Sequence, residues 1–131
     1  MRDGVRWALV TGASAGIGRA CAELHAAGWA VTGASRRGTT SGGWAGLVMD
    51  VDDDDSVRAG VTGMLAAGGR IDALVAVAGW GLAGAVEQCT IGEAKAQLET
   101  NFKAGERAGL LAKRLLPFRA FQAAAKSSLG V

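Results

Sequence analysis

The sequence predicts an α/β fold in which helices flank a parallel β-sheet. Short apolar runs at residues 7–10, 29–34, 45–49 and 71–78 alternate with longer segments that have helical periodicity. Apart from Asp72 near its start, the fourth run is apolar on both faces, as expected of a central parallel strand. A strand, helix, strand unit of the length of residues 7–34 predicts a right-handed parallel crossover.

Length and composition limit the class of protein. A chain of 131 residues forms one domain with a real core, and a content of 50% hydrophobic and 20% charged residues is typical of globular proteins. The net charge of +2 comes without a basic stripe interleaved with aromatic residues, which argues against nucleic acid as a partner. No apolar run approaches the ~20 residues of a membrane span. Cys21 and Cys89 lack metal-ligand spacing, and no secretory leader precedes them, so we expect a cytoplasmic protein with reduced cysteines.

The first strand runs into a glycine-rich segment, Thr-Gly-Ala-Ser-Ala-Gly-Ile-Gly-Arg, at residues 11–19. Gly12 suits a sharp turn, Gly16 a close approach of backbone to a phosphate, and Gly18 the tight packing of a helix on a strand. Ser14 adds a hydroxyl donor, and the free N–H groups of the following helix attract an anion. This pattern predicts a site for a nucleotide pyrophosphate. The alternative is an ordinary turn in a chain that contains 21 glycines.

A helix is predicted over residues 18–27 from the spacing of its apolar positions, with Gly28 as its stop. We interpret His25 on this helix as a surface or interface residue, because no acid or nucleophile lies near it in sequence.

The residues after the second strand, Ser35-Arg36-Arg37, favour NADP(H) over NAD(H). Folds that bind NAD place an acidic side chain at this position to bond the ribose 2′-hydroxyl. Here no carboxylate repels a 2′-phosphate, and guanidinium groups are available to form forked bonds to it. The alternative is that both arginines are solvated loop cations.

The third strand ends at Asp50-Val51, and four aspartates follow at residues 52–55. We interpret these as the start of a helix over residues 56–67, because Asp at an N-cap or in the first turn satisfies free N–H groups. A metal cluster is the less favoured interpretation, since adjacent aspartates in a helical turn do not converge on one ion. The fourth strand then leads into Ala78-Gly79, and a long helix is predicted over residues 91–116.

Taken together, these motifs resemble the short-chain dehydrogenase/reductase family. The resemblance lies in Thr-Gly-x-x-x-Gly-x-Gly at 11–18, Asp50-Val51, residues 72–75 leading to Ala78-Gly79, and residues 97–102, and it covers residues 5 to about 103. It implies a Rossmann-like sheet of order 3-2-1-4 that is incomplete relative to the full fold of the family. It also implies one NAD(P)-binding domain over residues 1–131, with a divergent helical tail at 104–131, and hydride transfer to or from an alcohol or carbonyl.

The resemblance assigns cofactor contacts to particular positions. Asp50 would meet the adenine amino group, Val51 would pack beside the ring, and the full cofactor-binding set is Gly12, Ser14, Gly16, Ile17, Gly18, Ser35, Arg36, Asp50, Val51, Ala78 and Gly79. The family has Asn-Asn-Ala-Gly after its fourth strand, whereas this chain has Ala-Val-Ala-Gly at 76–79, from which we expect a looser site.

The catalytic residues of the family are matched poorly. The family uses a Tyr as acid, a Lys four residues later and a Ser at the end of a fifth strand, but this chain contains no Tyr. The resemblance gives Asn101 a role in a proton relay, matches Lys126 to the Lys, and places Gln122 in the Tyr position. An amide does not deliver a proton at neutral pH, so impaired catalysis is expected. Whether the segment around Lys126 is a true remnant or a coincidence stays open.

Three interpretations of the chain remain open from its sequence. The first is an NADP(H)-dependent oxidoreductase, the second a nucleotide-binding module without turnover, and the third a truncated or frame-shifted gene product. No metal site is predicted. The apolar fourth strand would lie at a sheet edge, which predicts self-association.

Overall fold

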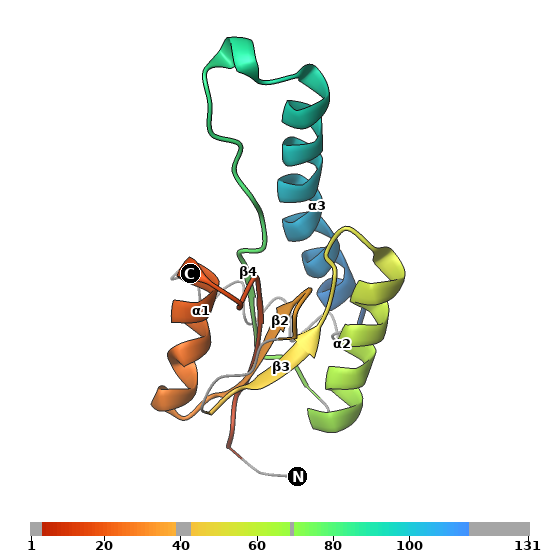
Figure 1. Ribbon diagram of the computed structural model, residues 1–131. Helices are drawn as coiled ribbons and strands as arrows, with labels where there is room; N and C mark the ends of the chain where they lie inside the picture. Colours follow the sequence, from red (N-terminus) through yellow and green to blue (C-terminus); the bar gives the residue numbers. More distant parts are fainter. Residues whose placement is uncertain (1–3, 39–42, 69, 116–131) are drawn as a thin grey trace, which may run out of the picture.

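The computed structural model describes residues 4–38, 43–68 and 70–115, and its elements follow one another as Figure 1 shows. They are β1 (Trp7–Thr11), α1 (Gly16–Ala22), the 3₁₀ turn η1 (Glu23–Ala27), β2 (Ala30–Ser35), β3 (Ala45–Val48), α2 (Asp54–Gly68), β4 (Ala73–Ala76), the 3₁₀ turn η2 (Val86–Gln88) and α3 (Ile91–Leu115). The four strands form one parallel sheet in the order β3-β2-β1-β4. The predicted fold class and strand order are confirmed.

Helices pack on both faces of the sheet, which explains why its strands are mostly apolar. Along β1, Ala8 and Val10 pack with Ala22 of α1, whereas Leu9 between them packs with Val57 of α2. α1 therefore covers one face, and α2 covers the other together with α3 (Figure 1). The residues of β1 from Ala8 to Val10 are at most 2% exposed, so this strand forms the centre of the core.

The ends of the first two helices follow from their sequence. Gly28 ends η1 in a left-handed conformation, with φ of 84°, and its N–H donates to the His25 carbonyl at 2.9 Å. The predicted single helix over 18–27 is thus a short α-helix followed by a 3₁₀ turn. At α2, the Asp53 carboxylate accepts from the N–H groups of Asp55 at 3.0 Å and Ser56 at 3.4 Å. This confirms the interpretation of the aspartates as a helix start.

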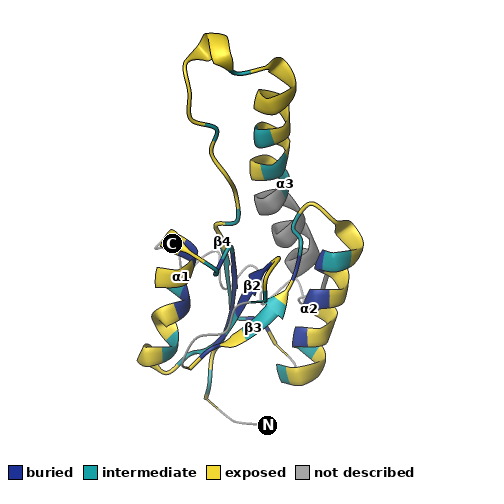
Figure 2. Ribbon diagram, in the orientation of Figure 1, coloured by how far each residue is buried: buried dark blue, intermediate teal, exposed yellow. Residues whose placement is uncertain are grey.

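The chain between β4 and α3 extends away from the sheet and returns along α3 (Figure 1). α3 begins with a capping box: the Thr90 N–H donates to Glu93 Oε2 at 2.9 Å, and the Glu93 N–H donates to Thr90 Oγ1 at 3.2 Å. The Thr90 N–H, together with the Thr90 hydroxyl that donates to the same Glu93 oxygen at 2.8 Å, lowers the pKa of Glu93 below its ordinary value. Figure 2 shows that this extension is mostly exposed, unlike the sheet. No helix in the described part of the chain has the length and apolar character to cross a membrane.

Candidate nucleotide-binding site

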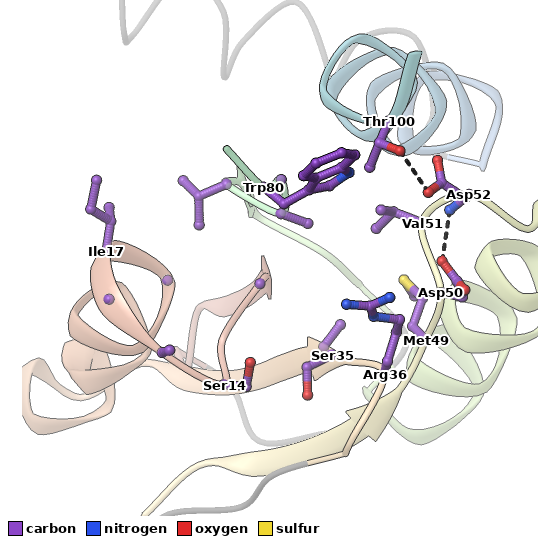
Figure 3. Close-up of a pocket in the computed structure, with 18 residues that line it drawn as sticks. Ser14, Ile17, Ser35, Arg36, Met49, Asp50, Val51, Asp52, Trp80 and Thr100 are labelled. Carbon is purple, nitrogen blue, oxygen red and sulfur yellow. Dashed lines mark hydrogen bonds between the residues drawn. The ribbon is translucent and has the colours of Figure 1, made fainter. Parts of the chain in front are cut away.

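A cavity of about 530 Å³ lies at the carboxyl ends of the four strands (Figure 3). This is where open parallel sheets bind their ligands. The structure brings all eleven residues of the expected cofactor-binding set to the wall of this one cavity, although they come from four separate segments of the chain: Gly12, Ser14, Gly16, Ile17, Gly18, Ser35, Arg36, Asp50, Val51, Ala78 and Gly79.

The glycine-rich loop leaves no room for side chains where it meets its neighbours. A Cβ on Gly12 would lie 2.9 Å from the Cα of Ala78, and one on Gly18 would lie 2.2 Å from the carbonyl oxygen of Gly12. Gly12 and Gly16 have φ of 71° and 54°, which L side chains rarely adopt. A Cβ on Gly16 would meet nothing within 4 Å, so this part of the backbone faces open space. The loop therefore offers the cavity a wall of bare backbone, which fits the close approach of a phosphate.

The end of β2 contributes an unsatisfied polar group. The Ser35 residue is 8% exposed, and its hydroxyl oxygen is buried with no hydrogen-bond partner among the described residues. Its carbonyl accepts from the N–H groups of Gly38 at 3.1 Å and Met49 at 3.0 Å, which fixes the turn that follows. Arg36 is exposed on the cavity wall beside it. Because a buried hydroxyl without a partner is costly, this corner fits a ligand that brings hydrogen-bonding oxygens.

The connection from β3 to α2 forms the facing wall and is held at several points. The Asp50 N–H donates to Ser56 Oγ at 3.0 Å, and Asp50 Oδ1 accepts from the Asp52 N–H at 3.0 Å. Thr100 of α3 donates its hydroxyl proton to Asp52 Oδ2 at 2.9 Å (Figure 3). This bond joins α3 to the wall that carries Asp50 and Val51.

Side chains of α3 also hold the segment after β4. Asn101 Oδ1 accepts from the Trp80 N–H, and Asn101 Nδ2 donates to the Trp80 carbonyl, both at 3.0 Å. One turn earlier, Gln97 Oε1 accepts from the Leu82 N–H at 3.1 Å. Between the end of β4 and Trp80, the Ala78 N–H donates to Thr11 Oγ1 at 3.2 Å. Asn101 is thus a backbone clamp outside the cavity wall, and its expected role in a proton relay stays a prediction.

The remaining predicted catalytic positions, Lys126 and Gln122, lie outside the described residues. The cavity wall in turn includes residues that the sequence analysis did not single out, among them Asp52, Trp80 and Thr100. Each is a near neighbour of a predicted position: Trp80 follows Gly79 directly, and Thr100 precedes Asn101. Extending each motif by one or two residues along its loop or helix would have found them.

Comparison with known proteins agrees with this geometry. Residues 6–108 match the family described as short chain dehydrogenase. The chain belongs to the short-chain dehydrogenase family. Membership implies a nicotinamide dinucleotide cofactor, and it agrees with a glycine-rich loop at the carboxyl end of β1.

Alignments with individual members of the short-chain dehydrogenase family show what share of their length this chain covers. It is 41% identical over 96 residues to a 3-ketodihydrosphingosine reductase of Bacteroides thetaiotaomicron, matching 72% of this chain and 36% of the reductase. The aldohexose dehydrogenase structure of Thermoplasma acidophilum aligns with a TM-score of 0.78 and 29% identity over 85% of this chain and 44% of that one. A short-chain dehydrogenase structure of Streptomyces avermitilis aligns with a TM-score of 0.72 and 33% identity over 88% and 44%. The chain spans less than half the length of these relatives.

Proposed function

We propose that this chain is an NADP(H)-binding oxidoreductase domain of the short-chain dehydrogenase family. The observation that carries the proposal is the convergence of the glycine-rich loop, Ser35, Arg36 and Asp50 on one cavity at the carboxyl ends of the strands. Bound there, the cofactor would supply or accept a hydride. The residues of this chain would hold it: backbone at 12–18 against the pyrophosphate, and Asp50 with Val51 beside the purine.

The preference for NADP(H) rests on the end of β2. Ser35 offers a buried hydroxyl that lacks a partner among the described residues, and Arg36 offers an exposed guanidinium on the same wall. No carboxylate occurs in Ser35-Arg36-Arg37 to compete for the ribose 2′-hydroxyl. A guanidinium forms short, charge-assisted bonds with phosphate, so a 2′-phosphate gains more at this corner than a hydroxyl does.

Catalysis by these 131 residues alone is proposed to be impaired. Reducing a carbonyl requires a group that protonates the developing alkoxide, and such a group contributes ~10²- to 10⁴-fold in rate. The sequence contains no Tyr, and the amide of Gln122 is no acid. The relatives act on a ketosphingoid base and on aldohexoses by name, and for this chain we propose only the broader class of an alcohol or carbonyl substrate.

Arg36→Ala tests the cofactor assignment directly. We expect the affinity for NADPH to fall about 10- to 100-fold, the range of a charge-assisted hydrogen bond, and the affinity for NADH to change little. Calorimetric titration with both dinucleotides measures this. Arg37→Ala is the matched control, because Arg37 is an exposed neighbour that does not line the cavity. Equal losses for both dinucleotides in Arg36→Ala would show that the 2′-phosphate assignment is wrong.

We also propose that the chain self-associates and that it works in the cytoplasm. Within the described residues β4 pairs with β1 only, and α3 exposes Leu98 and Phe102 to 59% and 74%. Cys21 and Cys89 are free thiols, in keeping with a reducing compartment. Size-exclusion chromatography over a range of concentrations tests the association. A monomer at the highest concentration would contradict it.

A further inference from the structure

Trp80 differs from the other three tryptophans of the chain. Trp44 is buried, and Trp7 and Trp29 are half-buried, whereas Trp80 is 42% exposed and lines the cavity. A large aromatic ring exposed beside a cavity forgoes the burial that normally stabilises it. A flat ligand that covers the ring would restore that burial.

The backbone of Trp80 is fixed although its ring is exposed. Asn101 bonds both its N–H and its carbonyl at 3.0 Å, and Asn101 itself is held in the regular helix α3. The next residues along the chain are held by the bond from Leu82 to Gln97. The indole therefore extends from an anchored backbone, which lowers the entropic cost of using it as a binding surface.

The surroundings of the ring indicate which half of the cofactor it meets. Figure 3 shows the indole on the α3 side of the cavity near Val51, and the guanidinium of Arg36 on the β2 side. Thr100, which lines the cavity next to the clamp residue Asn101, bonds Asp52 at 2.9 Å and holds the Val51 wall to α3. If Arg36 binds the 2′-phosphate, the ring that lies closest to this corner belongs to the adenosine.

We propose that Trp80 is a specificity-determining residue that stacks on the adenine ring, opposite Arg36. The proposal rests on the proposed function, because it requires a dinucleotide in this cavity. When an aromatic side chain that stacks on a base is replaced by alanine, the affinity typically falls roughly tenfold or more. The indole and the guanidinium would then enclose the purine from two sides, which favours an adenine dinucleotide over smaller phosphates.

The test uses the full chain and adenosine 2′,5′-bisphosphate, which contains the adenosine half and no nicotinamide. We expect it to quench tryptophan emission, and we expect the quenching to vanish in Trp80→Phe and Trp80→Ala. By calorimetry, Trp80→Phe should keep most of the affinity, whereas Trp80→Ala should lose about tenfold. Trp29→Phe is the matched control, because Trp29 lies away from the cavity beneath Arg6, and it should keep both the quenching and the affinity.

The possible results separate this inference from the proposed function. Unchanged or tighter binding in Trp80→Ala would overturn the stacking while leaving the dinucleotide site intact. Quenching by nicotinamide mononucleotide and none by adenosine 2′,5′-bisphosphate would also overturn it, since the ring would then meet the other half of the cofactor. If the unmodified chain binds no NADPH in the calorimeter, both the proposed function and the stacking fail.

Discussion

The glycine-rich loop and the extension that leads into α3 are built in opposite ways. In the loop, backbone packs on backbone, with Gly18 against Gly12 and Gly12 against Ala78, and the adjoining strand β1 is buried. In the extension, side-chain hydrogen bonds hold the chain, and large apolar residues such as Val86 and Ile91 are 87% exposed.

The loop and its strands are packed within the described chain, whereas the extension exposes apolar side chains. Helices pack on both faces of the sheet, so the proposed phosphate site lies beside buried hydrophobic clusters on each face. The extension presents apolar surface that the described residues do not cover. The alignments cover only 44% of each of these two relatives, so more than half of each relative has no counterpart in the aligned part of this chain.

The largest expected effect is a loss of stability when a side chain is added to the closely packed glycine-rich loop. Gly18→Ala would place a Cβ 2.2 Å from a backbone oxygen that has little freedom to move, and we expect a loss of about 3 kcal/mol in the free energy of unfolding. Gly63→Ala in α2 is the matched control. Its new Cβ would meet nothing within 4 Å, and Ala favours a helix over Gly by about 1 kcal/mol, so this variant should be more stable. Urea unfolding measures both variants. A tolerated Gly18→Ala would show that the loop is not closely packed.

A smaller effect is expected where side chains hold the extension. Asn101→Ala removes both bonds to Trp80, and Gln97→Ala removes the bond to Leu82, each bond contributing about 1 kcal/mol. Amide hydrogen exchange should quicken at Trp80 in the first variant and at Leu82 in the second, with little change at β1. Equal exchange at both amides in both variants would mean that the two clamps are not independent.

The sequence predicted the glycine-rich loop and the sheet better than it predicted the extension that leads into α3. The parallel strands and the glycine-rich turn were predictable because buried apolar runs and glycine spacing leave few alternatives, as at Leu9 and Gly12. The strand order and cavity residues such as Asp50 and Ala78 followed only from the resemblance to the family. The clamp by Asn101 and the exposed ring of Trp80 were not predictable, since they depend on how α3 returns beside β4 over a distance of 21 residues in sequence. The prediction of one continuous helix over residues 18–27 was wrong at its end, where a 3₁₀ turn replaces the α-helix. Apolar periodicity does not distinguish an α-turn from a 3₁₀ turn.

The smallest expected effect is a pH dependence at the start of α3. The pKa of Glu93 is lowered by its bonds from Thr90, so the carboxylate stabilises the helix start above the pKa of the unfolded chain. That stabilisation should fade as the pH falls through the lowered pKa of the folded state. The protection factor of the Ala94 amide, which compares its exchange with that of an unfolded chain at the same pH, should therefore fall in acid, because the Ala94 N–H donates to the Thr90 carbonyl. Glu93→Gln should remove most of this loss of protection, and a variant that loses protection to the same degree would contradict the assignment.

The most direct test is a crystal structure of the full chain with NADP⁺. We expect the pyrophosphate to lie against the backbone of residues 12–18 and the 2′-phosphate to lie beside Ser35 and Arg36. A nucleotide bound away from the carboxyl ends of the strands, or a cavity that stays without nucleotide at saturating NADP⁺, would contradict this expectation.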